Sequence, residues 1–160
     1  MNYVKKRVLR MRATPHAIAA GFAAGAFASF SPLMGLHFLL AALIAWFTRG
    51  NIIASAFGTF IGNFFTFPLI WSATYSLGSG ILGGGGRHHA ATKLWEYFSW
   101  SDFSFATVWP LIKPMALGGV ILGSIAWVIF YFPIRAAVRG YQTRRAAQIA
   151  GVRGAPEAAE

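Results

Sequence analysis

The polar side chains that could do chemistry in this sequence lie inside long apolar runs. His37 ends the stretch SPLMGLH, and the residues around that stretch are almost all Ala, Phe, Leu and Ile. An ionisable side chain in such a run is expected to face a helix-bundle interior or a water-filled cavity. Imidazole titrates near neutral pH, so His37 could relay protons. The alternative, which we favour, is a neutral imidazole bonded to a carbonyl that the break at Pro32 leaves free.

A second polar group lies in the next apolar run, where Asn63 and Thr66 precede Pro68. An amide and a hydroxyl can satisfy backbone groups exposed at a helix break, or they can line a polar site. Ser29 and Ser31 hold the corresponding places in the first run. We predict that the polar side chains beside the two breaks form one candidate site, made of Ser31, His37, Asn63 and Thr66.

Other chemistry is poorly represented. The chain has no cysteine, which excludes disulfides, zinc–thiolate sites and iron–sulfur clusters. His88 and His89 are adjacent, and the side chains of adjacent residues point apart in most backbone conformations, so we expect no metal site there even with Glu96 nearby in the sequence. No nucleophile–base set, Walker loop or dinucleotide fingerprint occurs, and no carboxylate lies within an apolar run. We therefore expect neither enzyme activity nor a cofactor.

The composition is that of an integral membrane protein. Hydrophobic residues make up 56% of the 160 residues and charged residues only 11%, whereas a soluble domain needs about 25% charged residues. The net charge of +10 is concentrated at the two ends, which favours two cytoplasmic termini near anionic lipid head groups and disfavours nucleic-acid binding. These basic residues are Lys5, Lys6, Arg7, Arg10 and Arg12 at one end, and Arg135, Arg139, Arg144, Arg145 and Arg153 at the other.

Three apolar segments are predicted, at residues 17–47, 52–82 and 105–132, between a basic lead (1–16) and a basic, partly disordered tail (133–160). Each of the first two has 31 residues, and a straight helix of that length would measure about 46 Å. The hydrocarbon core is only about 30 Å thick. We therefore predict an all-α multi-pass fold whose first two segments are broken or re-entrant helices. Three positions are expected to cause the breaks: Pro32, Gly35 and Pro68.

Orientation adds a constraint, because an odd number of crossings would put the two basic ends on opposite sides. We predict that the first segment enters and leaves on the cytoplasmic face, next to Arg49. The second segment would cross, the loop at 83–104 would face the periplasm, and the third segment would return. Lys113, at the start of the third segment, is expected to reach the membrane interface, with an anion contact as the alternative.

Glycine spacing predicts how the helices pack. GFAAGAFASFS, from Gly21, aligns without gaps with GTFIGNFFTFP, from Gly58, and four positions are identical. Glycines four residues apart let two helix backbones approach closely in lipid. We expect such packing at Gly21, Gly25, Gly58, Gly62, Gly119 and Gly123.

The order of these features resembles a family of bacterial membrane proteins catalogued as domain of unknown function 2062. The resemblance rests on GFAAGAFASFSPLMGLHFLLAALIAWFTRGNIIASAFGTFIGNFFTFP and on KPMALGG, and it covers about residues 14–132. Phe64 stands where the family usually has proline. The resemblance implies a bacterial inner-membrane protein and supplies no activity, substrate or cofactor.

Two functions are compatible with the sequence. The first is a small transport or permeation element with a polar site at the paired breaks. The alternative is an accessory or scaffold subunit whose small-residue helices pack against a larger membrane partner or a second copy of the chain.

Overall fold

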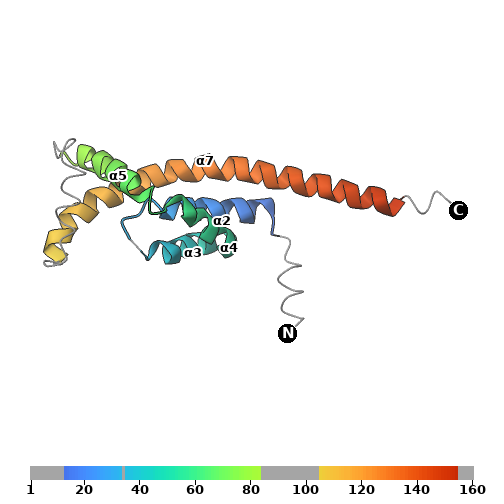
Figure 1. The fold of residues 1–160 in the computed structure, drawn as a ribbon, viewed down its shortest axis with the longest axis horizontal. Coiled ribbons are helices and arrows are strands. Elements are labelled where there is room, and N and C mark those ends of the chain that lie inside the picture. Colours follow the sequence, from blue (N-terminus) through green and yellow to red (C-terminus); the bar gives the residue numbers. More distant parts are fainter. Residues whose placement is uncertain (1–12, 34, 84–104, 155–160) are drawn as a thin grey trace, which may run out of the picture.

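A computed structural model describes residues 13–33, 35–83 and 105–154, and within these ranges it contains helices and turns but no strand. The expected all-helical fold is therefore confirmed for the described part of the chain. Figure 1 shows the longest helix, α7, extending along the whole molecule, with the other helices packed against one part of it. In chain order the elements are α2 (Pro15–Ala28), α3 (His37–Phe47), α4 (Ile52–Gly58), the 3-10 turn η1 (Thr59–Ile61), α5 (Phe67–Ile81) and α7 (Phe105–Gly154).

Helix α2 is the centre of the fold, and its sequence explains why. The Thr14 side chain caps it by accepting from the Ala17 N–H at 3.1 Å, and Pro15 occupies its first turn. Its alanines at positions 19, 20, 23, 24, 26 and 28 are all 0% exposed. A helix of such small residues can pack on several sides, and α2 contacts α7, α4 and α3.

The first apolar run folds into a helical hairpin. Helix α2 ends at Ala28 and α3 begins at His37, with Gly35 between them at φ +83°. That left-handed conformation strains any residue with a Cβ, which explains the glycine. Helix α3 then runs back beside α2, because the Thr48 carbonyl at its far end accepts from His16 in the first turn of α2.

A tight turn joins α3 to α4 and returns the chain to the start of α2. The Asn51 side chain caps α4 by accepting from the Ile53 and Ala54 N–H groups at 2.8 and 3.1 Å. The Asn51 backbone N–H donates to the Ala17 carbonyl at 2.7 Å. Helix α4 therefore begins level with α2 and runs parallel to it.

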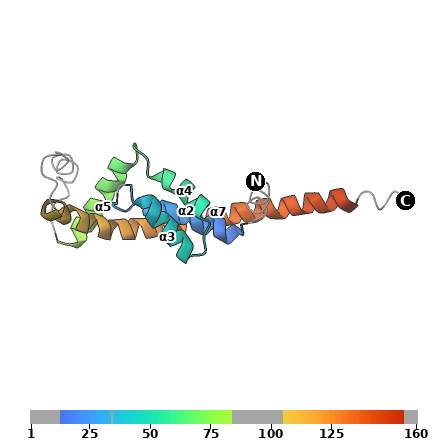
Figure 2. The same ribbon diagram turned by 90° about the horizontal axis from the view of Figure 1, so that it is seen from below.

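The second helix break lies before Pro68 in the chain and is not a kink at this proline. The turn η1 ends at Ile61 and α5 begins at Phe67, so the non-helical residues are 62–66. Pro68 lies in the first turn of α5, where its missing N–H has no helical partner to lose. Figures 1 and 2 show that α5 then continues beyond the cluster formed by α2, α3 and α4.

Helix α7 runs antiparallel to both α2 and α5. Gly119 lies against Phe30, and Gln142 donates to the Ala13 carbonyl at 3.1 Å, so α7 follows the whole of α2. Gly118 lies against Thr74 in α5. The helix changes direction near its start in Figure 1, in the part that contains Pro110 and Pro114.

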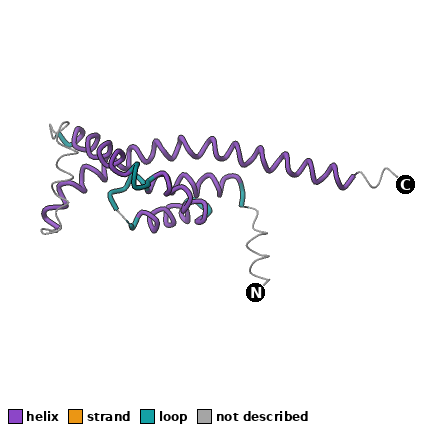
Figure 3. Tube along the Cα trace, viewed as in Figure 1, coloured by secondary structure: helices purple, strands orange, loops and turns teal. Residues whose placement is uncertain are grey.

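The third apolar segment, predicted at residues 105–132, lies within a longer helix. Helix α7 continues through Pro133 to Gly154 as one element of 50 residues, as the continuous coil in Figure 3 shows. Residues 134–150 are rich in Ala, Arg and Gln, which are good helix formers even where they bury nothing. The tail that was predicted to be partly disordered is therefore helical as far as Gly154, and residues 155–160 lie outside the described residues.

Length and hydropathy single out one candidate membrane-spanning helix in the described residues, Trp109–Ala150 within α7. The first two apolar runs are instead divided into helices of 14, 11, 7 and 15 residues. Each is shorter than the approximately 20 residues that one crossing needs. The basic residues at 1–12 and the loop with His88, His89 and Glu96 lie outside the described residues.

Candidate functional site

The two helix breaks meet at the side chain of Ser29. This residue is 0% exposed and caps the end of α2. Its hydroxyl lies 3.1 Å from the Gly25 carbonyl and 3.3 Å from the Thr59 carbonyl, and its oxygen accepts from the Gly62 N–H at 3.2 Å. A single hydroxyl therefore satisfies backbone groups from the first hairpin and from the second break.

His37 lies at the same junction. It is 7% exposed, and its backbone N–H donates to the Leu33 carbonyl at 3.0 Å. Its ring meets the ring of Phe67 edge-on, with centroids 5.7 Å apart and planes at 78°. The first residue of α3 thus contacts the first residue of α5. The buried Nδ1 atom of His37 has no hydrogen-bond partner among the described residues.

Asn63 and Thr66 hold the second break in shape. The Asn63 Oδ1 accepts from the Phe65 and Thr66 N–H groups at 2.9 and 3.0 Å. The Thr66 hydroxyl donates to the Ile61 carbonyl at 2.6 Å and accepts from the Asn63 N–H at 2.8 Å. These bonds replace helical hydrogen bonds that the break removes. Both side chains therefore form these hydrogen bonds within the second break.

The predicted cluster is therefore brought together only in part. Asn63 contacts Thr66, and His37 contacts Phe67, the next residue along the chain. In the described part of the chain, the Ser31 hydroxyl bonds only to the Leu33 N–H, at 3.3 Å. Ser29, and not Ser31 of the predicted cluster, bonds to the second break. Lys113 is exposed on α7.

All six glycines predicted to lie at helix contacts approach another element. A Cβ on Gly25 would overlap the Ser55 carbonyl, and one on Gly58 would overlap the Phe22 carbonyl, so α2 and α4 touch through their backbones. Gly119 approaches the Phe30 carbonyl in the same way. The remaining three approach Asn51 (Gly21), Ser29 (Gly62) and Phe27 (Gly123).

Sequence reasoning missed a second junction, at the opposite end of α2. His16 Nδ1 lies 2.8 Å from the Tyr131 hydroxyl, and Nε2 donates to the Thr48 carbonyl at 3.2 Å. Because a carbonyl can only accept, the Tyr131 hydroxyl donates to Nδ1 when the imidazole is neutral. His16 therefore joins α2, the end of α3 and α7. The separation of 115 residues between His16 and Tyr131 leaves no local signal of this contact.

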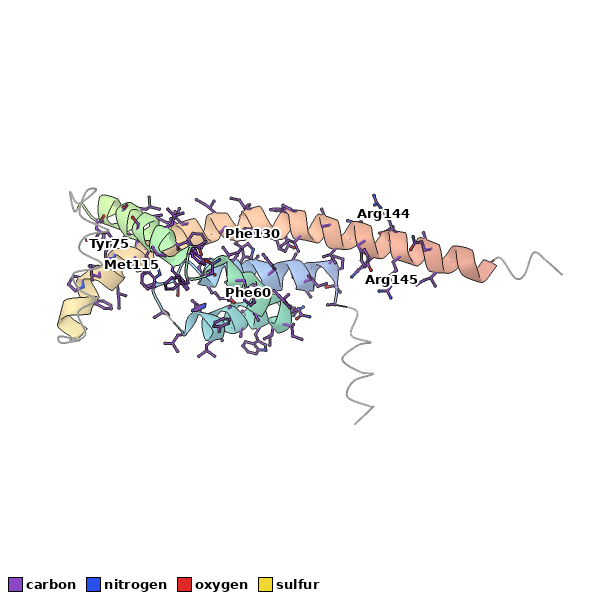
Figure 4. The ribbon with its side chains drawn as sticks, viewed as in Figure 1. Phe60, Tyr75, Met115, Phe130, Arg144 and Arg145 are labelled. Atoms are coloured by element: carbon purple, nitrogen blue, oxygen red, sulfur yellow. The ribbon has the colours of Figure 1, made fainter. Side chains whose placement is uncertain are left out.

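The outer surface of the hairpin and of α4 is apolar. In α3, Leu39, Trp46 and Phe47 are 68, 65 and 71% exposed. Four phenylalanines at the end of α4 and in the second break are 62–87% exposed, namely Phe57, Phe60, Phe64 and Phe65. Figure 4 labels Phe60 on the side of the cluster formed by α3 and α4, whereas Phe130 lies between α7 and α2, with its ring 5.7 Å from that of Phe22. Contiguous apolar exposure of this extent indicates contact with lipid or with another protein.

Comparison with known proteins adds a family relationship. The sequence profile of a bacterial family described as "Uncharacterized protein conserved in bacteria (DUF2062)" matches residues 1–147. No curated protein and no solved structure matches the chain.

Proposed function

Since the chain belongs to the bacterial family DUF2062, we propose that it is a small inner-membrane protein whose paired helix breaks form a polar transport or permeation site. The family description names no activity, so the support comes from the chain itself. It has three parts: how the helices fit a bilayer, how the hairpin enters it, and what lies at the breaks.

The dimensions of α7 suit one crossing. From Trp109 to Tyr131 the helix rises about 33 Å, close to the hydrocarbon thickness of about 30 Å. Apart from Lys113 and Ser124, the side chains on this stretch carry no strongly polar group, and one face of it is exposed, with Val128 and Ile129 at 53 and 58%. No Asp or Glu lies between residues 103 and 156. We place the basic end of α7, beyond Tyr131, in the cytoplasm.

The geometry of α2 and α3 supports a re-entrant hairpin. Both open ends of the hairpin lie together, because His16 bonds to the Thr48 carbonyl. Helix α2 is about 21 Å long and α3 about 16 Å long, so the tip would lie near mid-depth. Non-helical backbone at that depth must be buried in protein. Ser29, at the end of α2, is fully buried, whereas Leu33 and Gly35 in the turn are exposed in the single chain, so the proposed placement requires a second chain to cover the turn. The chain would enter and leave on the cytoplasmic side.

The second run then makes the crossing in two pieces. Helix α4 with η1 rises beside α2 as far as the tip, and α5 continues to the far side along α7. With α7 returning, the chain crosses the bilayer twice and both basic ends lie on one side. This arrangement satisfies the positive-inside rule without a third full crossing.

The observation that carries the proposed activity is the junction of the two breaks. Ser29 bonds to groups on both sides of it, and among the residues that the structure describes the buried Nδ1 of His37 has no hydrogen-bond partner. Leaving a buried polar atom unpaired costs about 1–3 kcal/mol, so such a nitrogen suits a site that receives a proton or another small polar species. Transporters commonly bind their substrates and coupling ions at paired broken helices near the middle of the bilayer.

Proton flux tests the proposal without a known substrate. The full chain is reconstituted into vesicles that contain a pH-sensitive dye, and the decay of an imposed pH gradient is followed. We expect faster decay than in empty vesicles, and decay at the empty-vesicle rate for His37→Gln. The control His16→Gln makes the same substitution at the other junction and should keep the wild-type rate. Wild-type vesicles no faster than empty ones would contradict proton permeation.

The accessory-subunit alternative is favoured by a different observation, the row of exposed phenylalanines at α4 and the second break. Phe64 and Phe65, at 85 and 87% exposure, are the most prominent. Such a row suits a helix of a partner as well as lipid. Native electrophoresis of mildly solubilised membranes decides between them: one stable larger assembly that is lost in Phe64→Ser/Phe65→Ser supports the subunit role, and migration as a single chain opposes it.

A further inference from the structure

An open groove lies on α7 beyond the helical cluster. It has a volume of about 670 Å³ and is lined by Phe132, Arg135, Ala136, Arg139, Gly140, Thr143 and Arg144. Ala136 and Gly140 keep its floor low, and a Cβ on Gly140 would meet no atom within 4 Å. The walls are long side chains, so the groove is open toward solvent along one face of the helix.

The walls of the groove are cationic and have no carboxylate beside them on α7. At about 100° per residue, Arg135 and Arg139 lie on one side of the floor formed by Ala136 and Gly140, and Arg144 lies on the other side of that floor. No Asp or Glu occurs between residues 103 and 156, so no acidic side chain can pair with them from within this helix. Guanidinium groups bind phosphate through paired N–H donors. The groove therefore suits a phosphate-bearing ligand.

The two ends of the groove differ, and this difference identifies the ligand. Phe132 is 60% exposed at the end nearest the helical cluster, and Arg144 lies about 18 Å farther along the axis. One turn before Arg135 is Tyr131, and the Arg135 guanidinium lies 5.8 Å from the Tyr131 ring centre. Through Tyr131 and His16 the apolar end is fixed at the level where the hairpin opens.

We propose that this groove binds the head group of an anionic phospholipid of the cytoplasmic leaflet, with the phosphate between the arginines and the glycerol end over Phe132. This proposal rests on the membrane placement argued above. A free phosphate would use the arginines but not the apolar end. A lipid uses both, because its polarity changes along its length as the groove does.

Native mass spectrometry of the full chain in detergent tests the proposal. Equimolar phosphatidylglycerol and phosphatidylcholine are added, and bound lipids are counted for two variants of equal net charge. Arg139→Gln/Arg144→Gln removes two groove arginines, whereas Arg49→Gln/Arg145→Gln removes two outside it. Figure 4 shows Arg144 and Arg145 on different sides of α7. We expect about 25-fold weaker phosphatidylglycerol retention in the first variant, at about fivefold per arginine, and wild-type retention in the second.

Equal retention of phosphatidylglycerol by the two variants would overturn the proposal, and so would a wild-type chain that retains phosphatidylcholine equally well. Millimolar glycerol 3-phosphate serves as the head group without its chains. Displacement of the lipid by glycerol 3-phosphate at millimolar concentration would identify a free-phosphate site and also overturn it. These results are independent of proton flux and of hairpin topology, so failure here leaves the proposed function standing. The topology of the hairpin is tested by a separate experiment, in which single cysteines are labelled with an impermeant thiol reagent.

Discussion

Ser29 and Gly62, 33 residues apart in sequence, are joined by a hydrogen bond of 3.2 Å from the Gly62 N–H to the Ser29 hydroxyl. This bond connects the end of α2 to the second helix break, and the same hydroxyl reaches the Thr59 carbonyl at 3.3 Å. A helix interrupted within a bilayer must satisfy the backbone groups it frees. Here one small buried side chain links the two interruptions, and the Gly62 N–H and the Thr59 carbonyl also bond to each other at 3.0 Å.

Removing this hydroxyl should destabilise the junction. Ser29→Ala removes the hydroxyl bonds to the Gly62 N–H and the Thr59 carbonyl, which keep their own bond to each other at 3.0 Å. The expected cost is therefore that of ordinary hydrogen bonds, about 0.5–1.5 kcal/mol each. The control is Ser124→Ala, because Ser124 is exposed and bonds only within its own helix, to the Val120 carbonyl at 2.6 Å. Thermal unfolding in detergent should show a lower midpoint for Ser29→Ala alone. Equal midpoints would show that the bridge contributes nothing.

Close packing of α2 on α4 gives a sharper prediction. Gly25→Ala adds a Cβ that overlaps the Ser55 carbonyl, so the two backbones must separate. Overpacking of this kind costs about 1–3 kcal/mol. Gly80→Ala makes the same change in α5, where a Cβ meets nothing within 4 Å. That control should be neutral or slightly stabilising, because alanine favours helix by about 0.5–1 kcal/mol over glycine. A stable Gly25→Ala protein would be incompatible with the α2–α4 contact.

The turn of the hairpin depends on backbone conformation rather than on space. Gly35 has φ +83° and no neighbour within 4 Å of an added Cβ. Gly35→Ala should therefore lower stability by about 1–2 kcal/mol, and Gly35→Asn should lower it less, because asparagine tolerates positive φ better. The order glycine, asparagine, alanine in unfolding midpoint is the expected result. An alanine variant as stable as the wild type would mean that the turn is not left-handed.

The junction at the opposite end of α2 can be measured by a double-mutant cycle. His16→Ala and Tyr131→Phe each remove one side of the 2.8 Å contact. We expect each change to destabilise the protein and the pair to cost less than the sum, with a coupling of about 0.5–1.5 kcal/mol. Additive losses would show that the two side chains do not interact.

Much of this fold follows from local chemistry. The SPLMGLH insert predicts an interruption between two half-helices, and the described residues between Ala28 and His37 are non-helical. The Asn63-x-x-Thr66 spacing also predicts backbone capping, which both side chains perform. Glycine spacing predicts close approach, because four residues separate successive contacts on one face of a helix. These features are local, and their energies are set within a few residues.

What could not be predicted depends on distant pairs. Gly78 and Gly118 bring α5 and α7 into backbone contact, yet neither lies in one of the glycine pairs that the sequence indicates. Ser29 rather than Ser31 bridges the breaks, because α2 ends before Pro32 and turns Ser31 toward Leu33. The long extension of α7 was missed since a polar, alanine-rich helix needs no buried face.

The central claim is that the first apolar run enters and leaves on the same side of the membrane. Because the natural chain has no cysteine, single substitutions can be labelled with an impermeant thiol reagent in intact cells and in inverted vesicles. The sites are Arg49→Cys at the hairpin exit, Gly140→Cys on the basic end of α7 and Gly80→Cys near the end of α5. We predict that Arg49→Cys and Gly140→Cys are labelled only in inverted vesicles and Gly80→Cys only in intact cells. Labelling of Arg49→Cys from outside, together with Gly80→Cys, would contradict the re-entrant hairpin.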